Sequence, residues 1–302
     1  MVLSVNLLSF CTNSYIVTKN NFYKLDYNIM LTITRAVSRD TYRRSLITSI
    51  TNFVETTPIN GLIYSYDAIN RVITRNDDSF GYNTKSEVTF ANISNFNSRY
   101  GYDEIGNSTN WVANCLNQYT TFTYDIDDNL LSDETYSYSY DVANQLKTVS
   151  ANDVMLLTND YDSKSRRVRK VTPAATTTYF YDDWNLIEEY IAYTNDNTSI
   201  THYYWGKDLS GSFQGAGGVG GLLYLTIDSS TFVPLYDNNG NITHYLDSNG
   251  NVVAQYTYDA FGNIIAQSGL LANTFRHRVQ RNHNFNKVLY RYYIASSEQT
   301  SK

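Results

Sequence analysis

The chain has 302 residues, enough for one large or two ordinary domains that need neither disulfides nor a structural metal. Charged residues make up 17% of the sequence and aromatic residues 15%, with 29 tyrosines, and this composition excludes highly charged disorder. The net charge of -6 argues against a nucleic-acid binder, which needs a basic surface to contact phosphates.

Residues 1–60 carry no copy of the repeat found further along the chain. We expect short strands there and one helix around Arg35 to Ile50, so residues 1–60 form a divergent N-terminal segment. The two cysteines, Cys11 and Cys115, are too few for a disulfide framework or a zinc cluster. No apolar run approaches the roughly 18 to 20 residues that cross a bilayer, so we predict no membrane span.

From residue 61 onward a short pattern recurs, in which tyrosine is followed by aspartate. The pair occurs eight times, where chance predicts about two, and a ninth unit has Leu246 in the tyrosine position. The third residue after each aspartate is Asn, Asp, Ser or Gly, all of which tolerate a tight turn. The nine aspartates are Asp67, Asp103, Asp125, Asp141, Asp162, Asp182, Asp237, Asp247 and Asp259, and the glycines are Gly106, Gly240, Gly250 and Gly262.

Each unit is interpreted as a β-hairpin. An aspartate at the start of a turn can accept hydrogen bonds from the turn's own backbone, and the following Gly or Asn supplies a left-handed residue. In six units a second aromatic residue stands two positions before the tyrosine, which is strand periodicity and lines up rings on one sheet face. We therefore predict an all-β fold of repeated antiparallel hairpins that form a curled strip of sheet.

The repeated acids could also be read as catalytic carboxylates, but catalysis needs one distinct pair in different surroundings. All nine acids occupy the same position of a repeated turn, and a structural role explains this more simply than catalysis does. The segment Gly215 to Gly220 satisfies the G-x-G-x-x-G dinucleotide pattern, yet a β-rich stretch follows it instead of a helix. The histidines His202, His244, His277 and His283 lack metal-ligand spacing. We predict no catalytic, cofactor-binding or metal-binding residue, no cofactor, and no enzyme.

The units YDEIGN, YDNNGN and YDAFGN resemble the YD repeat of bacterial RHS (rearrangement hot spot) proteins and of the teneurins. The segment from Thr201 to Arg276 is similar to the RHS-repeat-associated core of such proteins. In that family the hairpins form one continuous strip, which winds into a hollow shell around a C-terminal toxin or other cargo. The resemblance implies a hairpin array over 61–275, with 201–276 core-like, and a basic tail over 276–302 that is a degenerate end of the core. Members of the family commonly continue after the core into an Asp-Pro-x-Gly cleavage motif. This sequence contains no Asp-Pro pair, so the resemblance implies a truncated or degenerate member.

The expected function follows from this resemblance: a non-catalytic structural fragment of an RHS or YD-repeat shell, associated with toxin encapsulation and delivery or with cell-surface contact. The expected partners are other shell segments or an enclosed polypeptide cargo, with no nucleic acid. Sheet edges left open would also permit self-association. The alternative is a carbohydrate- or surface-binding β module, since exposed Tyr and Trp rings are good stacking platforms. The sequence leaves the localisation open.

Overall fold

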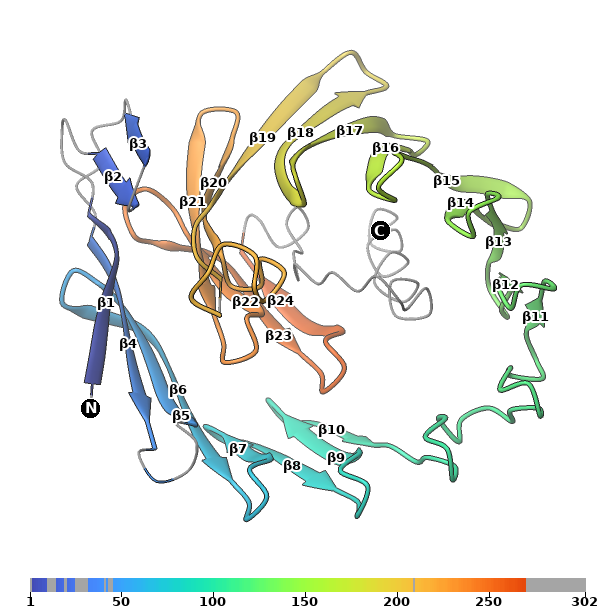
Figure 1. Ribbon diagram of the computed structural model, residues 1–302, viewed down its shortest axis with the longest axis horizontal. Helices are drawn as coiled ribbons and strands as arrows, with labels where there is room; N and C mark the ends of the chain where they lie inside the picture. Colours follow the sequence, from blue (N-terminus) through green and yellow to red (C-terminus); the bar gives the residue numbers. More distant parts are fainter. Residues whose placement is uncertain are drawn as a thin grey trace. The chain divides into compact units, whose positions relative to one another are not determined.

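The structure is a computed structural model that describes residues 2–9, 15–18, 21–24, 32–40, 42, 46–208 and 210–269, with only the backbone described before residue 32. These residues form 24 β-strands and no helix, in three antiparallel sheets (Figure 1). The predicted all-β fold of repeated antiparallel hairpins is confirmed. The predicted basic tail over 276–302, with His277 and His283, lies outside the described residues, as does Cys11.

An eight-stranded sheet has the order β1-β4-β5-β6-β7-β8-β9-β10. Its strands are β1 (Val2–Ser9), β4 (Thr32–Arg39), β5 (Ile47–Val54), β6 (Thr57–Tyr66), β7 (Val72–Arg75), β8 (Asp78–Tyr82), β9 (Val88–Ile93) and β10 (Phe96–Arg99). The strands β2 (Tyr15–Thr18) and β3 (Asn21–Lys24) form a separate two-stranded sheet.

The helix expected around Arg35 to Ile50 is wrong, because β4 and β5 occupy its described residues and pair with each other from Ile33↔Val54 to Arg39↔Ile47. Both strands are rich in β-branched residues, which favour strands over helices.

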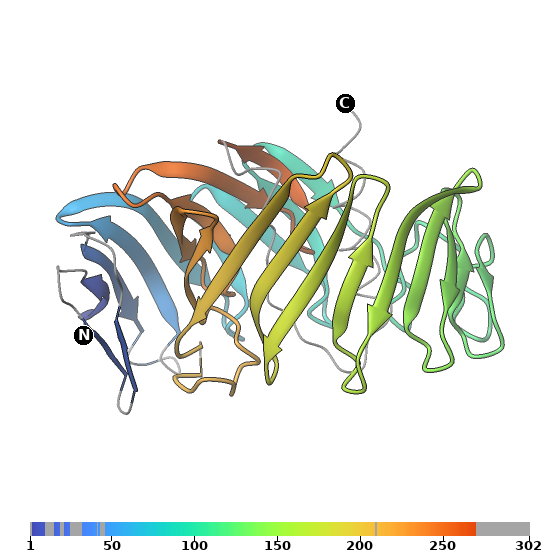
Figure 2. The same cartoon turned by 90° about the horizontal axis from the view of Figure 1, so that it is seen from above.

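A fourteen-stranded sheet holds the remaining strands in simple sequence order, from β11 to β24. They are β11 (Thr123–Tyr124), β12 (Leu130–Ser132), β13 (Ser137–Tyr140), β14 (Leu146–Ala151), β15 (Val154–Tyr161), β16 (Arg167–Val171), β17 (Ala175–Asp182), β18 (Asn185–Tyr193), β19 (Thr198–Trp205), β20 (Leu222–Ile227), β21 (Ser230–Tyr236), β22 (Ile242–Leu246), β23 (Val252–Tyr258) and β24 (Ile264–Ser268). Figure 2 shows consecutive strands from β13 to β19 lying side by side. Every connection is thus a local hairpin, as expected of a repeat that pairs each unit only with its neighbours.

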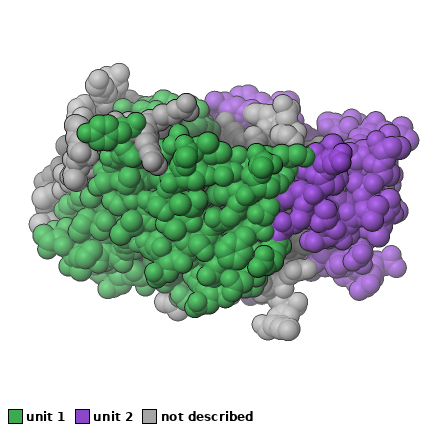
Figure 3. Space-filling view, turned by 90° about the horizontal axis from the view of Figure 1, so that it is seen from below, with its two compact units in different colours: residues 1–99, 206–224, 230–280 green, residues 100–205, 225–229, 281–302 purple. Residues whose placement is uncertain are grey.

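The chain divides into two compact units (Figure 3). Unit 1 comprises residues 1–99, 206–224 and 230–280, and unit 2 comprises residues 100–205, 225–229 and 281–302. The segment boundaries expected from the sequence, at residues 60 and 275, stay predictions.

The core of unit 1 joins the two ends of the described chain. Ile33 of β4 is fully buried and packs in one cluster with Leu235 of β21 and Leu246 of β22. Tyr224 and Val233 complete the buried cluster, and Val54, Ile59 and Leu223 pack against it. Strands about 200 residues apart in sequence therefore share one apolar core, although they belong to different sheets.

Unit 2 is built from local contacts. Its apolar cluster contains Tyr138, Val149 and Leu157, from three consecutive strands, and Leu130 and Leu146 pack against it. Residues 100–122 form no strand and make two isolated bridges, Tyr102↔Ser108 and Ala113↔Tyr119. Further along the strip, the widest hairpin of this unit pairs β17 with β18 from Ala175↔Tyr193 to Asp182↔Asn185.

Candidate functional site: the repeated aspartate turn

The turn after β23 shows the local geometry of one repeat unit. Asp259 N–H donates to the carbonyl of Asn263 at 2.8 Å, and Gly262 N–H donates back to the carbonyl of Asp259 at 3.1 Å. The carboxylate of Asp259 closes the loop, since its Oδ1 accepts the N–H groups of Phe261 at 2.9 Å and Asn263 at 2.8 Å. Its Oδ2 accepts the side-chain amide of Asn263 at 2.7 Å. Gly262 has a φ of +84°, the left-handed conformation that glycine adopts without strain.

Eight of the nine predicted aspartates make this turn. In each, Oδ1 accepts the backbone N–H groups of the second and fourth following residues, at distances of 2.8 to 3.0 Å. The third following residue has a φ between +58° and +94° in all eight turns. The eight are Asp67, Asp103, Asp125, Asp141, Asp162, Asp237, Asp247 and Asp259, and four of their left-handed residues are Gly106, Gly240, Gly250 and Gly262.

Asp182 is placed differently. It is the last residue of β17 and lies opposite Asn185, the first residue of β18. The connection consists of Asp183 and Trp184 alone, and Asp183 takes the left-handed conformation with a φ of +48°. The register of this hairpin shortens the loop to two residues. Asn185, which the repeat pattern places in the turn, is therefore the first residue of β18.

The same turn occurs at two positions that a search for Tyr-Asp pairs misses, Asn83 and Asn114. Their Oδ1 atoms accept the N–H groups of the second and fourth following residues at 2.9 to 3.0 Å. The side-chain amide then donates to the fourth following side chain, Glu87 Oε2 at 2.5 Å or Gln118 Oε1 at 3.2 Å. In these two turns the first side chain therefore donates the hydrogen bond to the side chain of the fourth following residue, whereas in the Asp259 turn the first side chain accepts it. A search that accepts Asn in the Asp position, with a turn-tolerant residue three positions later, would find both turns.

In two turns the hydrogen bonds lower the pKa of the carboxylate. The side-chain amide of Asn107 and backbone N–H donors hold the pKa of Asp103 below its ordinary value. The amide of Asn129 does the same for the pKa of Asp125. A general acid needs a raised pKa so that it carries a proton near neutral pH, and these carboxylates are shifted the opposite way.

Several of the tyrosines that precede a turn have a role beyond ring packing. Their hydroxyl groups donate to a backbone carbonyl in an earlier part of the strip: Tyr82, which precedes Asn83, to Val72 at 2.8 Å, Tyr161 to Leu146 at 2.9 Å, and Tyr258 to Ile242 at 2.7 Å. The acceptor in these cases is the first residue of the outgoing strand of an earlier hairpin. The sequence shows the aromatic stripe but gives no sign of this bond. The tyrosine therefore links one hairpin to another, which phenylalanine could not do.

The glycine-rich segment is a compact loop closed by a carboxylate. Gly206 N–H donates to the carbonyl of Gly221 at 2.7 Å and joins the two ends of the loop. Inside it, Asp208 Oδ2 accepts the N–H groups of Ala216 at 2.7 Å and Gly218 at 3.1 Å. Burial acts to raise the pKa of Asp208, but hydrogen bonds from Ser210 and these amides outweigh it and hold the pKa below its ordinary value. In a dinucleotide site, backbone N–H groups of the glycine-rich loop bind the phosphate and a helix follows. Here the N–H groups of Ala216 and Gly218 already donate to Asp208, and the strand β20 follows the loop.

The described histidines do not gather into a metal site. His202 Nδ1 lies 3.3 Å from Glu188 Oε2, and His244 Nδ1 lies 3.0 Å from the side-chain amide of Asn60. Across the described part of the chain, no group of three or more His, Cys, Asp or Glu side chains is arranged to hold a metal ion. Nor does this part contain a helix long and apolar enough to cross a membrane.

Comparison with known proteins identifies the repeat. A family model described as RHS Repeat matches residues 236–269, which contain the turns of Asp237, Asp247 and Asp259. The chain contains an RHS repeat over these residues. Its resemblance to the RHS and YD-repeat family, first drawn from the Tyr-Asp units, is thereby confirmed.

Two Bacillus proteins match about half of the chain. The chain is 29% identical over 186 residues to the tRNA3(Ser)-specific nuclease WapA of Bacillus spizizenii, a match that covers 54% of this chain and 7% of that protein. It is 28% identical over 184 residues to the tRNA nuclease WapA of Bacillus subtilis strain 168, with the same shares. The chain thus spans only a small part of the length of these relatives.

Two solved toxin structures share the fold. The Tc holotoxin pore of Photorhabdus luminescens matches with a TM-score of 0.62 at 13% identity, over 79% of this chain and 15% of that chain. The TcdB2-TccC3-Cdc42 complex matches with a TM-score of 0.62 at 12% identity, over the same shares. At such low identity the likeness concerns the fold alone, an antiparallel strip of β-hairpins.

Proposed function

We propose that the chain is a non-catalytic wall segment of an RHS shell, and that it acts in enclosing a polypeptide cargo for toxin delivery or cell-surface contact. The observation that carries this proposal is the turn geometry. In eight of the predicted aspartates the carboxylate oxygen Oδ1 accepts backbone N–H groups of the same turn, and hydroxyl bonds of several tyrosines link one hairpin to another. Residues with these roles stabilise a strip of β-sheet. The likeness to RHS proteins supports the proposal that this strip is part of a shell.

The proposal separates this chain from the nuclease activity in the names of its relatives. The chain covers only 7% of each WapA protein, so the named activity can lie in any of the remaining parts. We expect the purified chain to leave tRNA intact. Cleavage of tRNA that disappears in an Asp259→Asn variant would overturn the non-catalytic assignment.

Protection of a guest polypeptide tests the shell role directly. An unfolded, protease-sensitive guest is fused to the C-terminus of the chain, and its digestion rate is compared with that of the same guest added in trans. A guest fused to an unrelated all-β protein of similar size is the control. The wall-segment proposal predicts slower digestion only in the fusion with this chain. Equal digestion in all three samples would contradict an enclosing role.

One observation favours the second candidate, a carbohydrate- or surface-binding module. Phe180, Tyr190 and Tyr204 are exposed on strands β17, β18 and β19, on the face opposite the buried Tyr179 and Tyr203. The Glu188 and His202 pair lies among these rings and could hydrogen-bond sugar hydroxyls. A glycan array decides: reproducible hits that are lost in a Tyr190→Ala variant would favour the module, and an empty array would remove it.

A further inference from the structure

Two parts of unit 1 meet through side-chain contacts and not through a β-ladder. We call the group Ile33, Arg35, Asn60, Tyr64 and Arg75, on β4, β6 and β7, the docking face. We call β21, its turn 237–241 and β22 the Asp237 hairpin. The docking face belongs to the eight-stranded sheet and the Asp237 hairpin to the fourteen-stranded sheet. Their association can therefore be undone without breaking a strand pairing.

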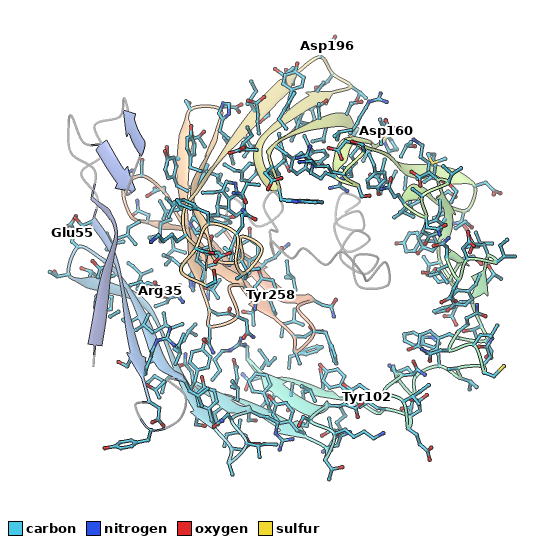
Figure 4. All side chains as sticks on the ribbon, viewed as in Figure 1. Arg35, Glu55, Tyr102, Asp160, Asp196 and Tyr258 are labelled. Atoms are coloured by element: carbon cyan, nitrogen blue, oxygen red, sulfur yellow. The ribbon has the colours of Figure 1, made fainter. Side chains whose placement is uncertain are left out.

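The turn of the Asp237 hairpin lies against two arginines. Arg35 Nη2 donates to the carbonyl of Asp237 at 3.3 Å, and Arg75 Nη1 lies 3.8 Å from Asp237 Oδ2 (Arg35 is labelled in Figure 4). Tyr64 Oη accepts the N–H of Asn238 at 3.0 Å. Asp237 is only 2% exposed, and its carboxylate still makes all the bonds of an ordinary repeat turn. The contacts with the docking face are thus additional to the turn and specific to this hairpin.

The strands of the hairpin extend the contact. The side-chain amide of Asn60 lies 3.4 Å from Thr243 Oγ1 and 3.0 Å from His244 Nδ1 on β22. Ile33 of the docking face shares the apolar cluster with Leu235 and Leu246, all three at most 1% exposed. Buried apolar area gives such a contact its strength, and buried charge-assisted contacts give it specificity.

Two neighbouring turns provide a built-in comparison. Asp247 and Asp259 make the same internal hydrogen bonds as Asp237. Within the described ranges, no cation lies within ion-pair distance of either carboxylate. The docking face therefore distinguishes one repeat turn from others of identical local geometry.

The connection between the two sheets contains no strand. β10 ends the eight-stranded sheet and β11 begins the fourteen-stranded sheet, and residues 100–122 between them contribute the isolated bridges Tyr102↔Ser108 and Ala113↔Tyr119 and the local turns of Asp103 and Asn114. A poorly paired connection of this kind can rearrange at low cost, which is the condition for exchanging an element between identical chains.

We propose that the docking face is a recognition surface for the Asp237 hairpin and that a second copy of this chain can supply that hairpin. Two copies then exchange hairpins and form a dimer through the same contacts that close each monomer. Since the contacts in the exchanged and unexchanged forms are identical, concentration and the connection over residues 100–122 set the balance between them. This inference does not depend on the proposed cargo.

The test uses two variants of the full chain with different affinity tags. The face variant carries Tyr64→Phe and Arg75→Met, and the hairpin variant carries Asp237→Asn. Each copy alone has a damaged contact in either arrangement. A mixed dimer has one contact that is intact and one that carries all the substitutions, so it loses the Arg75 to Asp237 pair once, whereas each homodimer loses that pair twice. The copies are refolded together from urea at high concentration, and dimers carrying both tags are measured by pull-down and sedimentation.

We expect the mixed dimer to dissociate about tenfold less readily than either homodimer, and an Asp247→Asn copy to behave as wild type. Circular dichroism checks that each variant folds, and Tyr64→Phe alone serves as a milder face variant. Mixed dimers no tighter than the homodimers would overturn the proposal and point to pairing through sheet edges. An Asp247→Asn copy as damaged as the Asp237→Asn copy would also overturn it.

Discussion

Replacing Asp259 by alanine should lower the free energy of unfolding by about 1 to 2 kcal/mol, whereas asparagine should cost less than about 0.5 kcal/mol. Alanine removes three acceptor contacts, to the N–H groups of Phe261 and Asn263 and to the Asn263 amide. Each such bond contributes about 0.5 to 1.5 kcal/mol net, and water replaces part of this because Phe261 is exposed at the loop tip. The expected loss is therefore below the simple sum.

Asparagine retains the oxygen that accepts both backbone N–H groups. Its amide would face the amide of Asn263, but rotation of the Asn263 side chain restores a donor and acceptor pair. The Asn114 turn has this arrangement already, with the Asn114 amide donating to Gln118 Oε1.

The assay is denaturant unfolding of wild type, Asp259→Ala and Asp259→Asn, compared by their midpoints at constant slope. An Asp247→Ala and Asp247→Asn pair should give the same order, since that turn has the same geometry. If asparagine destabilises as much as alanine at both positions, the carboxylate acts through something other than turn hydrogen bonds, and the reasoning fails.

Four further outcomes follow from the same geometry. Tyr258→Phe should cost about 1 kcal/mol through the lost hydroxyl bond, while Tyr190→Phe, at an exposed position, should change the unfolding midpoint little. Gly262→Val should cost about 1 to 3 kcal/mol because a β-branched residue resists its φ of +84°, and Gly262→Asn should be tolerated; equal midpoints for the two would count against the strained-turn reasoning. Folding lowers the pKa of Asp103 and other turn carboxylates, so these groups stabilise the folded state at pH values above the unfolded pKa of about 3.9. This stabilisation is lost as the pH falls through the pKa of the folded state. A urea midpoint that stays flat from about pH 5 to pH 2 would contradict this. Asp208→Ala should speed amide exchange within loop 206–221 and leave the strand amides slow, whereas unchanged loop exchange would mean that the carboxylate does not close the loop.

The parts of the fold that depend on neighbouring residues could be predicted from the sequence. The Asp and the left-handed residue three positions later define the turn by themselves, so eight turn positions follow from spacing alone. Asn83 and Asn114 escape the same search because an amide oxygen can replace a carboxylate oxygen, which a search for one residue type does not consider. Asp182 departs from the pattern because the register between β17 and β18 fixes the loop length, and register is not a local property.

The contacts that join distant segments could not be predicted. Arg35 lies in the segment without repeats and Arg75 follows the first repeat turn, and nothing near either residue in sequence indicates that both will contact Asp237. The tyrosine hydroxyl bonds were missed for a similar reason, since periodicity shows which face a ring occupies but not which carbonyl its hydroxyl reaches. Long-range packing decides both, and one sequence read by itself carries no signal of it.

Site-resolved amide exchange on the full chain tests most directly whether the repeat acids are structural turn residues. The N–H of the fourth residue after each turn acid, such as Asn107, Asn129 and Asn263, donates to the carboxylate of the same turn. The first residue after the acid, such as Glu104, lies at the exposed tip. We predict that the fourth-position amides exchange much more slowly than the first-position amides in the seven turns other than that of Asp237, and that Asp→Asn variants preserve this difference. In the Asp237 turn the first-position amide, Asn238 N–H, donates to Tyr64 Oη and should exchange slowly as well. Fourth-position amides that exchange as fast as the tip would contradict the account.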